Sequence, residues 1–156
     1  MSKAFTREED DAVPLEEPLP ARPREPLPIT PAGLEKLRAE HAVHVVNGAG
    51  SSRAARLVKS VIDTVVATPA GRVRGGAGFG CGVEVEHEDG RRRRYTLVGP
   101  DEANPSAGRI SVASPLARLL LGQQAGAELQ FRKPAGEETL RIIAIDVPEE
   151  GRPGTP

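Results

Sequence analysis

Prolines are concentrated at the beginning of the chain, and they restrict what this part can fold into. Six of the 15 prolines lie within residues 1–28. Proline lacks a backbone N–H and has a fixed φ angle, so this stretch is expected to join neither a helix nor a sheet. The same residues include seven acidic side chains and few apolar ones to offset the entropy of ordering. We therefore predict that residues 1–28 form a disordered acidic tail, which is either a solvating spacer or a screen for a basic surface.

Composition argues against several classes of protein. No apolar run approaches the ~20 residues of a membrane-spanning helix, and residues 1–8 lack the apolar stretch of a signal peptide. The single cysteine, Cys81, cannot form an internal disulfide, which suits a cytoplasmic protein. His41 and His44 have a spacing that can hold a metal, but no carboxylate or cysteine completes a site. We expect no cofactor, no metal and no membrane contact.

Two short helices are expected after the tail. Thr30 and Pro31 have the pattern of an N-cap followed by proline at the first helical position. The serine pair ending at Ser52 can cap a second helix, which we extend to Pro69. Its apolar side chains recur as one stripe at helical spacing: Leu57, Val58, Val61, Ile62 and Val65. We assign residues 29–70 to a short antiparallel helical hairpin.

The second half of the chain has the pattern of strands and tight turns. Residues 79–87 alternate between apolar and polar or glycine positions, as in a half-buried strand. Asp89 and Gly90 form a strong hairpin-turn signal, and Ser114 with Pro115 begins a helical turn. We predict an α+β fold for residues 71–148, a small twisted antiparallel sheet with one short helix over it, followed by a frayed tail at 149–156. The expected strands after the turn are 91–98, 109–112, 127–132 and 138–147.

No catalytic constellation emerges from the residue types, so we predict that the protein is not an enzyme. Cys81 belongs to the apolar row of the first strand, which indicates a buried thiol. His87, just before the hairpin turn, is expected at a solvent-facing strand end. The arginine run at residues 91–94 is the strongest charge feature, but side chains on a strand alternate between its two faces. The run can contact a phosphate or an acidic protein, or it can protect a sheet edge from aggregation.

Three segments resemble the C-terminal domain of the GreA/GreB transcription elongation factors. They follow the family's order and spacing over about residues 72–148, at 95–103, 108–120 and 134–137. Residues 29–40 resemble the start of the family's N-terminal coiled coil, and residues 53–68 resemble its end. The architecture is similar to a GreA/GreB factor with a shortened coiled coil. It is also similar to the Rnk-type regulator of nucleoside diphosphate kinase.

The resemblance implies a fold, a partner and a docking site. It implies an FKBP-like domain that docks on the rim of the RNA polymerase secondary channel and meets nucleic acid only through the transcription complex. It implies that the loop around Ser114 and Pro115 contributes to the polymerase contact, and we add Asp101 and Arg109 from the matching segments. Ala113 stands where family members often have Asp or Asn, which removes a polar partner. We expect a monomer.

Charge adds one candidate to this docking surface. Arg92 and Arg94 are expected to contribute electrostatically if they meet an acidic surface. The pI of about 6.3 and the lack of a basic surface interleaved with aromatic residues weigh against direct binding to nucleic acid.

The tip of the shortened coiled coil departs from the family pattern. In the family, acidic residues in an Asp-x-x-Glu-Asn-like motif help to hold Mg²⁺ at the polymerase active site and promote cleavage of backtracked RNA. Residues 41–52 of this chain contain no Asp or Glu. Even a generous arm of about 18 residues spans only ~27 Å at 1.5 Å per residue. We therefore predict a polymerase-binding elongation regulator at the secondary channel that does not stimulate cleavage.

Two alternatives stay open. A Rnk-like regulator would bind another protein, such as nucleoside diphosphate kinase. A peptidyl-prolyl isomerase is suggested by fold analogy alone, and it would need an aromatic-lined pocket built from Phe79, Tyr95 and Phe131.

Overall fold

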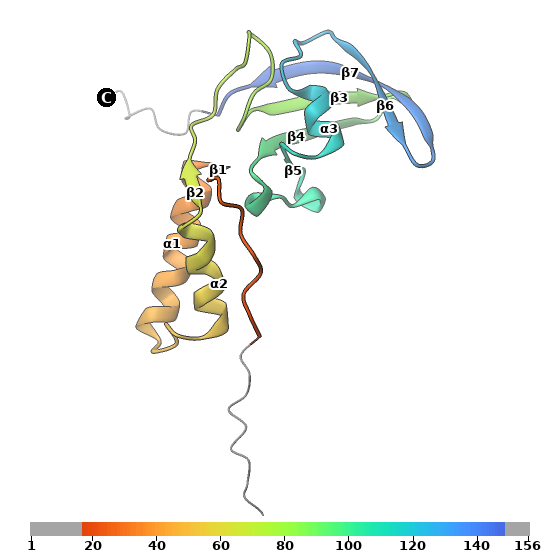
Figure 1. The fold of residues 1–156 in the computed structure, drawn as a ribbon. Helices are drawn as coiled ribbons and strands as arrows, with labels where there is room; N and C mark the ends of the chain where they lie inside the picture. The colour runs from red at the N-terminus through yellow and green to blue at the C-terminus, as the bar shows by residue number, and fades with distance from the viewer. Residues whose placement is uncertain (1–16, 149–156) are drawn as a thin grey trace, which may run out of the picture.

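The computed structural model describes residues 17–148, which form a helical hairpin attached to a curved sheet (Figure 1). The hairpin projects away from the sheet, and a short pair of strands connects the two parts. The α+β class predicted from the sequence is confirmed. The predictions for residues 1–16 and 149–156 lie outside the described residues. Within residues 17–148 no helix is long and apolar enough to cross a membrane.

The hairpin consists of helix α1, Pro31–Val46, and helix α2, Arg53–Ile62. Both N-caps predicted from the sequence are present. The Thr30 hydroxyl accepts a hydrogen bond from the backbone N–H of Gly33 at 3.1 Å, and the Ser52 hydroxyl accepts one from Ala55 at 3.2 Å. Each cap satisfies a backbone donor that the first turn of a helix leaves free, which explains where the two helices begin.

The second helix ends earlier than its apolar stripe predicts. Val65 does not continue α2, because it begins strand β2, Val65–Ala67.

The prediction of a disordered tail over residues 1–28 is wrong at its last two residues. Strand β1, Leu27–Ile29, pairs with β2 in parallel, so the end of the proline-rich stretch does join a sheet. Proline is tolerated on an edge strand, where its missing N–H need not face the partner. The partner strand lies far away in the sequence, which is why local patterning missed this pair.

The main sheet has five strands in the order β5-β4-β3-β7-β6. The prediction of an antiparallel sheet is wrong at one edge, because β5 runs parallel to β4. The connection from β4 to β5 contains two short 3-10 helices, η1 at Pro100–Glu102 and η2 at Pro105–Ala107. The strands are β3 Gly82–His87, β4 Arg92–Val98, β5 Arg109–Ser111, β6 Glu128–Lys133 and β7 Gly136–Asp146.

The hydrophobic core lies between one face of this sheet and helix α3, Pro115–Leu120 (Figure 1). Ala117 and Leu120 of α3 are fully buried against the sheet. The buried strand residues alternate in the sequence as predicted: Val83, Val85, Leu97, Leu140 and Ile142. Cys81 is also buried, which confirms the prediction for its thiol. The packing of α3 on the sheet thus fixes the start of this helix, where the candidate docking residues Ser114 and Pro115 lie.

Candidate protein-docking surface

Ser114 and Pro115 form the start of α3 on the surface of the domain. The Ser114 hydroxyl accepts a hydrogen bond from the backbone N–H of Ala117 at 3.3 Å, so Ser114 is the N-cap of this helix. Pro115 occupies the first turn and is exposed, as is Ala113 just before the cap. The buried Ala117 fixes this short turn to the sheet. The half-buried cap and the exposed proline therefore form a corner that is fixed to the sheet.

Asp101 lies at a different place, the junction between the sheet and the hairpin. Both of its carboxylate oxygens accept hydrogen bonds from Arg22, at 2.6 and 2.7 Å. The two side chains are mostly buried, and the bond to Asp101 raises the pKa of Arg22. The Nε of the same guanidinium donates to the Thr64 hydroxyl at 2.9 Å. Asp101 is thus engaged inside the chain rather than displayed on its surface.

Glu102 makes a second connection at this junction. One carboxylate oxygen accepts from the backbone N–H of Thr30 at 2.8 Å, and the other pairs with the Thr30 hydroxyl. Gly33 leaves room for the carboxylate, because a Cβ at that position would lie 1.8 Å from a Glu102 oxygen. The first turn of α1 is therefore held directly by η1.

Arg109 begins β5 beside the same junction. Its side chain lines a cavity of about 310 Å³ together with Asp101, Glu102 and residues of α1. Its Nε is buried and has no hydrogen-bond partner among the described residues. The structure thus brings Asp101 and Arg109 together in one cavity, whereas Ser114 and Pro115 lie past the other end of β5.

Arg92 and Arg94 point to the face of the sheet that α3 does not cover. Arg92 pairs with Glu86 at 3.1 Å and approaches Glu84 at 3.8 Å. Arg94 pairs with Asp146 near the end of β7. The charges of both arginines are therefore balanced by neighbouring strands.

Arg91 and Arg93 point to the opposite face, as the alternation of a strand requires. They line a cavity of about 300 Å³ at the end of the sheet, which we call the basic cup. Its walls combine basic, aromatic and aliphatic side chains: His87, Arg91, Arg93, Tyr95, Leu116, Phe131, Lys133 and Leu140. Sequence reasoning missed this group, since its members come from the turn between β3 and β4 as well as from β3, β4, α3, β6 and β7.

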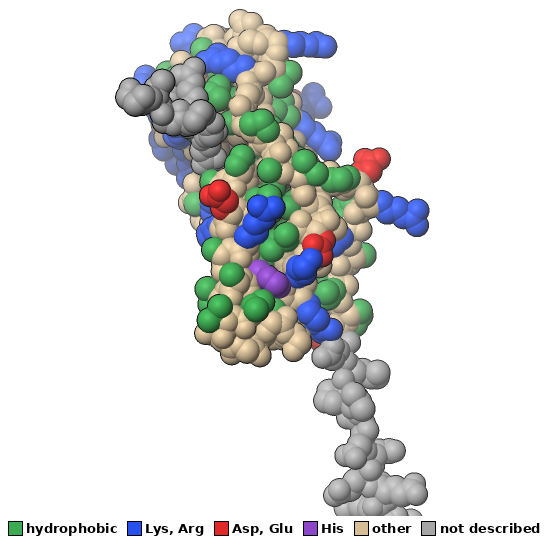
Figure 2. Space-filling view, turned by 90° about the vertical axis from the view of Figure 1, so that its left-hand side faces the viewer, with side chains coloured by type: hydrophobic (Ala, Val, Ile, Leu, Met, Phe, Trp, Pro, Cys, Tyr) green, Lys and Arg blue, Asp and Glu red, His purple; other side chains and the backbone are tan. Residues whose placement is uncertain are grey.

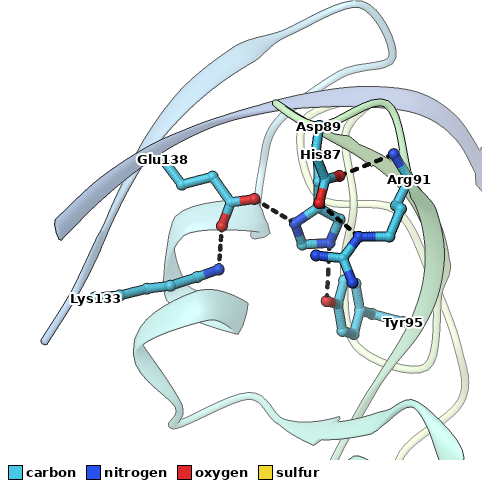
Figure 3. A network of polar contacts seen from close by, with 6 residues as sticks. All are labelled: His87, Asp89, Arg91, Tyr95, Lys133 and Glu138. Atoms are coloured by element: carbon cyan, nitrogen blue, oxygen red, sulfur yellow. Dashed lines mark hydrogen bonds and ion pairs between the residues drawn. The ribbon is translucent and has the colours of Figure 1, made fainter. Parts of the chain in front are cut away.

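His87 is at the centre of a polar network inside the cup (Figure 3). Its Nδ1 is 2.7 Å from Glu138, and its Nε2 is 3.3 Å from the Tyr95 hydroxyl. Only 12% of its side chain is exposed, so the prediction of a solvent-facing strand end is wrong. The alternation could have shown this, because His87 follows Val83 and Val85 on the core face of β3.

The network also stabilises the ionised form of the Glu138 carboxyl group. Lys133 and then His87 stabilise its carboxylate, and together they hold the pKa of Glu138 below its ordinary value. Lys133 lies 5.8 Å above the ring of Phe131, so the same ammonium group also covers an aromatic wall of the cup. Among residues 17–148, no three His, Cys, Asp or Glu side chains are grouped as metal ligands would be.

Comparison with known proteins identifies the sheet and its covering helix. The family model "Transcription elongation factor, GreA/GreB, C-term" matches residues 72–147. These residues are a GreA/GreB C-terminal domain. The match contains every strand of the main sheet and α3, and with them the docking candidates Ser114, Pro115, Asp101 and Arg109.

Similar proteins from several bacteria are named as GreA and GreB factors. GreB of Pseudomonas aeruginosa is 46% identical over 70 residues, 45% of this chain and 42% of that protein. GreB of Yersinia pestis is 39% identical over 57% of this chain and 52% of that protein. GreA of Sulfurovum sp. is 35% identical over 67% of this chain and 65% of that protein. The chain thus spans about half of the length of the relatives that it matches.

A solved structure also resembles the chain. GreA factor homolog 1 of Thermus thermophilus is 24% identical and covers 78% of this chain and 99% of its own, with a TM-score of 0.41. A TM-score at this level adds nothing to the assignment of the GreA/GreB domain, which rests on the sequence match.

The hairpin lies outside the GreA/GreB domain match, and the end of its first helix exposes three valines. Val43, Val45 and Val46, near the end of α1, are all more than half exposed, and Val46 is 84% exposed. On the face drawn in Figure 2, apolar side chains alternate with Lys and Arg side chains, and acidic ones are few. Residues 41–52 thus include exposed apolar side chains and offer no carboxylate to a metal.

Proposed function

We propose that this chain is an accessory protein of RNA polymerase that docks through its GreA/GreB domain and regulates transcription elongation without stimulating transcript cleavage. It acts in the cytoplasm, as a monomer, on the rim of the secondary channel. The observation that carries the proposal is the match of residues 72–147 to the GreA/GreB C-terminal domain. The FKBP-like character of the sheet and the docking role of its residues are part of this proposal.

Docking is assigned first to the corner made by Ser114 and Pro115. This corner is exposed, capped and fixed to the core, so a partner pays little entropy to order it. Arg109 and Asp101 lie together at the junction, at the other end of β5, and act on docking through the position of the hairpin. Arg92 and Arg94 contribute to binding only where acidic groups of the polymerase replace the partners that these arginines have within the sheet.

The absence of cleavage stimulation is inferred from the hairpin. Helix α1 has 16 residues, a length of ~24 Å at 1.5 Å per residue. Its tip exposes valines, and residues 41–52 contain no Asp or Glu. Metal-assisted cleavage needs oxygen ligands to hold Mg²⁺. This hairpin therefore has neither the ligands nor the length for that role.

Binding to core RNA polymerase is the direct test. The full chain should be retained by immobilised core polymerase, should compete with a GreA or GreB factor, and should not restart a backtracked complex by RNA cleavage. A chain that neither binds nor competes would contradict the docking proposal. Binding accompanied by cleavage would contradict only the inference from the tip.

A second function deserves the same assay with a different partner. The combination of a short hairpin with a GreA/GreB domain is the architecture of the Rnk-type regulator, which favours binding to a protein such as nucleoside diphosphate kinase. An isomerase has less support, because Tyr95 and Phe131 line the basic cup but Phe79 does not. Retention by immobilised kinase, but not by polymerase, would favour the first of these alternatives.

A further inference from the structure

The basic cup has one positive charge that no acidic side chain among residues 17–148 balances. Asp89 pairs with Arg91, and Glu138 is shared by Lys133 and His87. Arg93 also points into the cup. Of the residues that the structure describes, none makes a hydrogen bond or an ion pair with the Arg93 side chain. The cup therefore has an exposed guanidinium that is available to an anion.

The walls of the cup restrict the kind of anion. Tyr95, Phe131 and Leu116 give it apolar sides, and its volume of about 300 Å³ exceeds what a single carboxylate fills. Arginine forms two parallel hydrogen bonds with a carboxylate, while aromatic and aliphatic walls bind apolar side chains. An acidic residue next to an apolar residue, on a protein loop, matches both features.

The cup is continuous with the corner proposed for docking. Leu116, which lines the cup, directly follows Pro115 in α3. A protein segment bound at Ser114 and Pro115 would therefore lie next to the mouth of the cup.

From this placement we infer that the basic cup binds an acidic side chain, flanked by an apolar one, of the RNA polymerase segment that docks on α3. Arg93 is its ion-pair partner. The inference rests on the proposed function, since polymerase docking at α3 provides the segment. It adds the chemistry that the polymerase segment must carry and a residue that recognises it.

The test compares two single substitutions that remove the same charge. Arg93→Gln removes the guanidinium from the cup. Arg132→Gln is the matched control, because Arg132 lies on β6 between cup residues Phe131 and Lys133 but points away, paired with Glu137 at 2.8 Å. Both side chains are exposed, so both variants should melt like the unchanged chain.

Affinity for core polymerase is then measured at two salt concentrations. We expect Arg93→Gln to weaken binding about tenfold and to reduce its salt dependence, as for a lost charge-assisted contact. Arg132→Gln should change it less than about twofold, as for an exposed ion pair. Arg93→Lys should bind more tightly than Arg93→Gln but less tightly than the unchanged chain, because lysine keeps the positive charge and lacks the planar guanidinium group.

The outcomes separate this inference from the docking proposal. If the unchanged chain binds polymerase and Arg93→Gln binds equally well, the cup is not a contact and docking stands. Binding of inorganic phosphate to the unchanged chain and to Arg93→Gln is measured as well. If phosphate binding depends on Arg93 while the substitution leaves polymerase affinity unchanged, the cup is a site for a free anion and the inference is wrong. If the unchanged chain does not bind polymerase, both proposals fail.

Discussion

Arg22 holds Asp101 through two hydrogen bonds of 2.6 and 2.7 Å, although 79 residues separate them in the sequence. The same guanidinium donates to Thr64 at the end of the hairpin. One side chain thus joins the N-terminal segment, the hairpin and the GreA/GreB domain. This arrangement gives Asp101 a role in orienting the hairpin, which would affect docking indirectly.

Breaking this pair should destabilise the junction. We expect Arg22→Ala or Asp101→Asn to lower the free energy of unfolding by about 1–2 kcal/mol, because the bonds are charge-assisted and partly buried. The double variant should cost less than the sum of the two, since each substitution removes the same contact. Chemical denaturation of the four chains measures this coupling. Arg24→Ala, at an exposed position of the same segment, is the control, and a coupling of zero would contradict the assignment.

Gly99 should be intolerant of any side chain. A Cβ at this position would lie 1.8 Å from the backbone oxygen of Pro28 in β1. Backbone cannot move aside as a flexible side chain can, so Gly99→Ala should destabilise the chain by about 1–3 kcal/mol. Gly71→Ala is the matched control, because a Cβ there has no atom within 4 Å. Equal melting temperatures for the two variants would show that Gly99 does not lie this close to the Pro28 backbone of β1.

The sequence predicts those parts of the fold that depend on local chemistry. The caps at Thr30 and Ser52, the strand alternation and the start of α3 are set by neighbouring residues, and the structure confirms them. The pairing of β1 with β2 and the parallel edge strand β5 depend on contacts between distant segments. A short strand such as Leu27–Ile29 has no periodicity of its own to reveal it.

The candidate site shows the same limit. Ser114 and Pro115 are predicted by motif and lie at the start of α3, where Pro115 is exposed and Ser114 is half-buried. The basic cup is not visible in any motif, because five separate elements supply its walls. Period-2 alternation does place His87 and Arg93 on the core faces of their strands, so part of the cup was readable in the sequence.

Stability should fall at acid pH through Glu138. Lys133 and His87 hold its pKa below the ordinary value, about 4.3 for glutamate in an unfolded chain. A depressed pKa gives stability that is present above the unfolded value and is lost as the pH falls through the folded one. Unfolding free energies measured from about pH 6 to pH 3 should therefore decline less steeply in Glu138→Gln than in the unchanged chain. Parallel declines would contradict this role.

Restoring an acid before the Ser114 cap should strengthen docking. Ala113 is exposed, and the resemblance to GreA/GreB factors implies Asp or Asn at this position. If the polymerase offers a donor there, Ala113→Asp should raise affinity for core polymerase about fivefold, the effect of one ordinary hydrogen bond of about 1 kcal/mol. Ala125→Asp adds the same charge at another exposed loop position and should leave affinity unchanged. An equal gain in both variants would indicate a general charge effect, and no gain in either would remove position 113 from the interface.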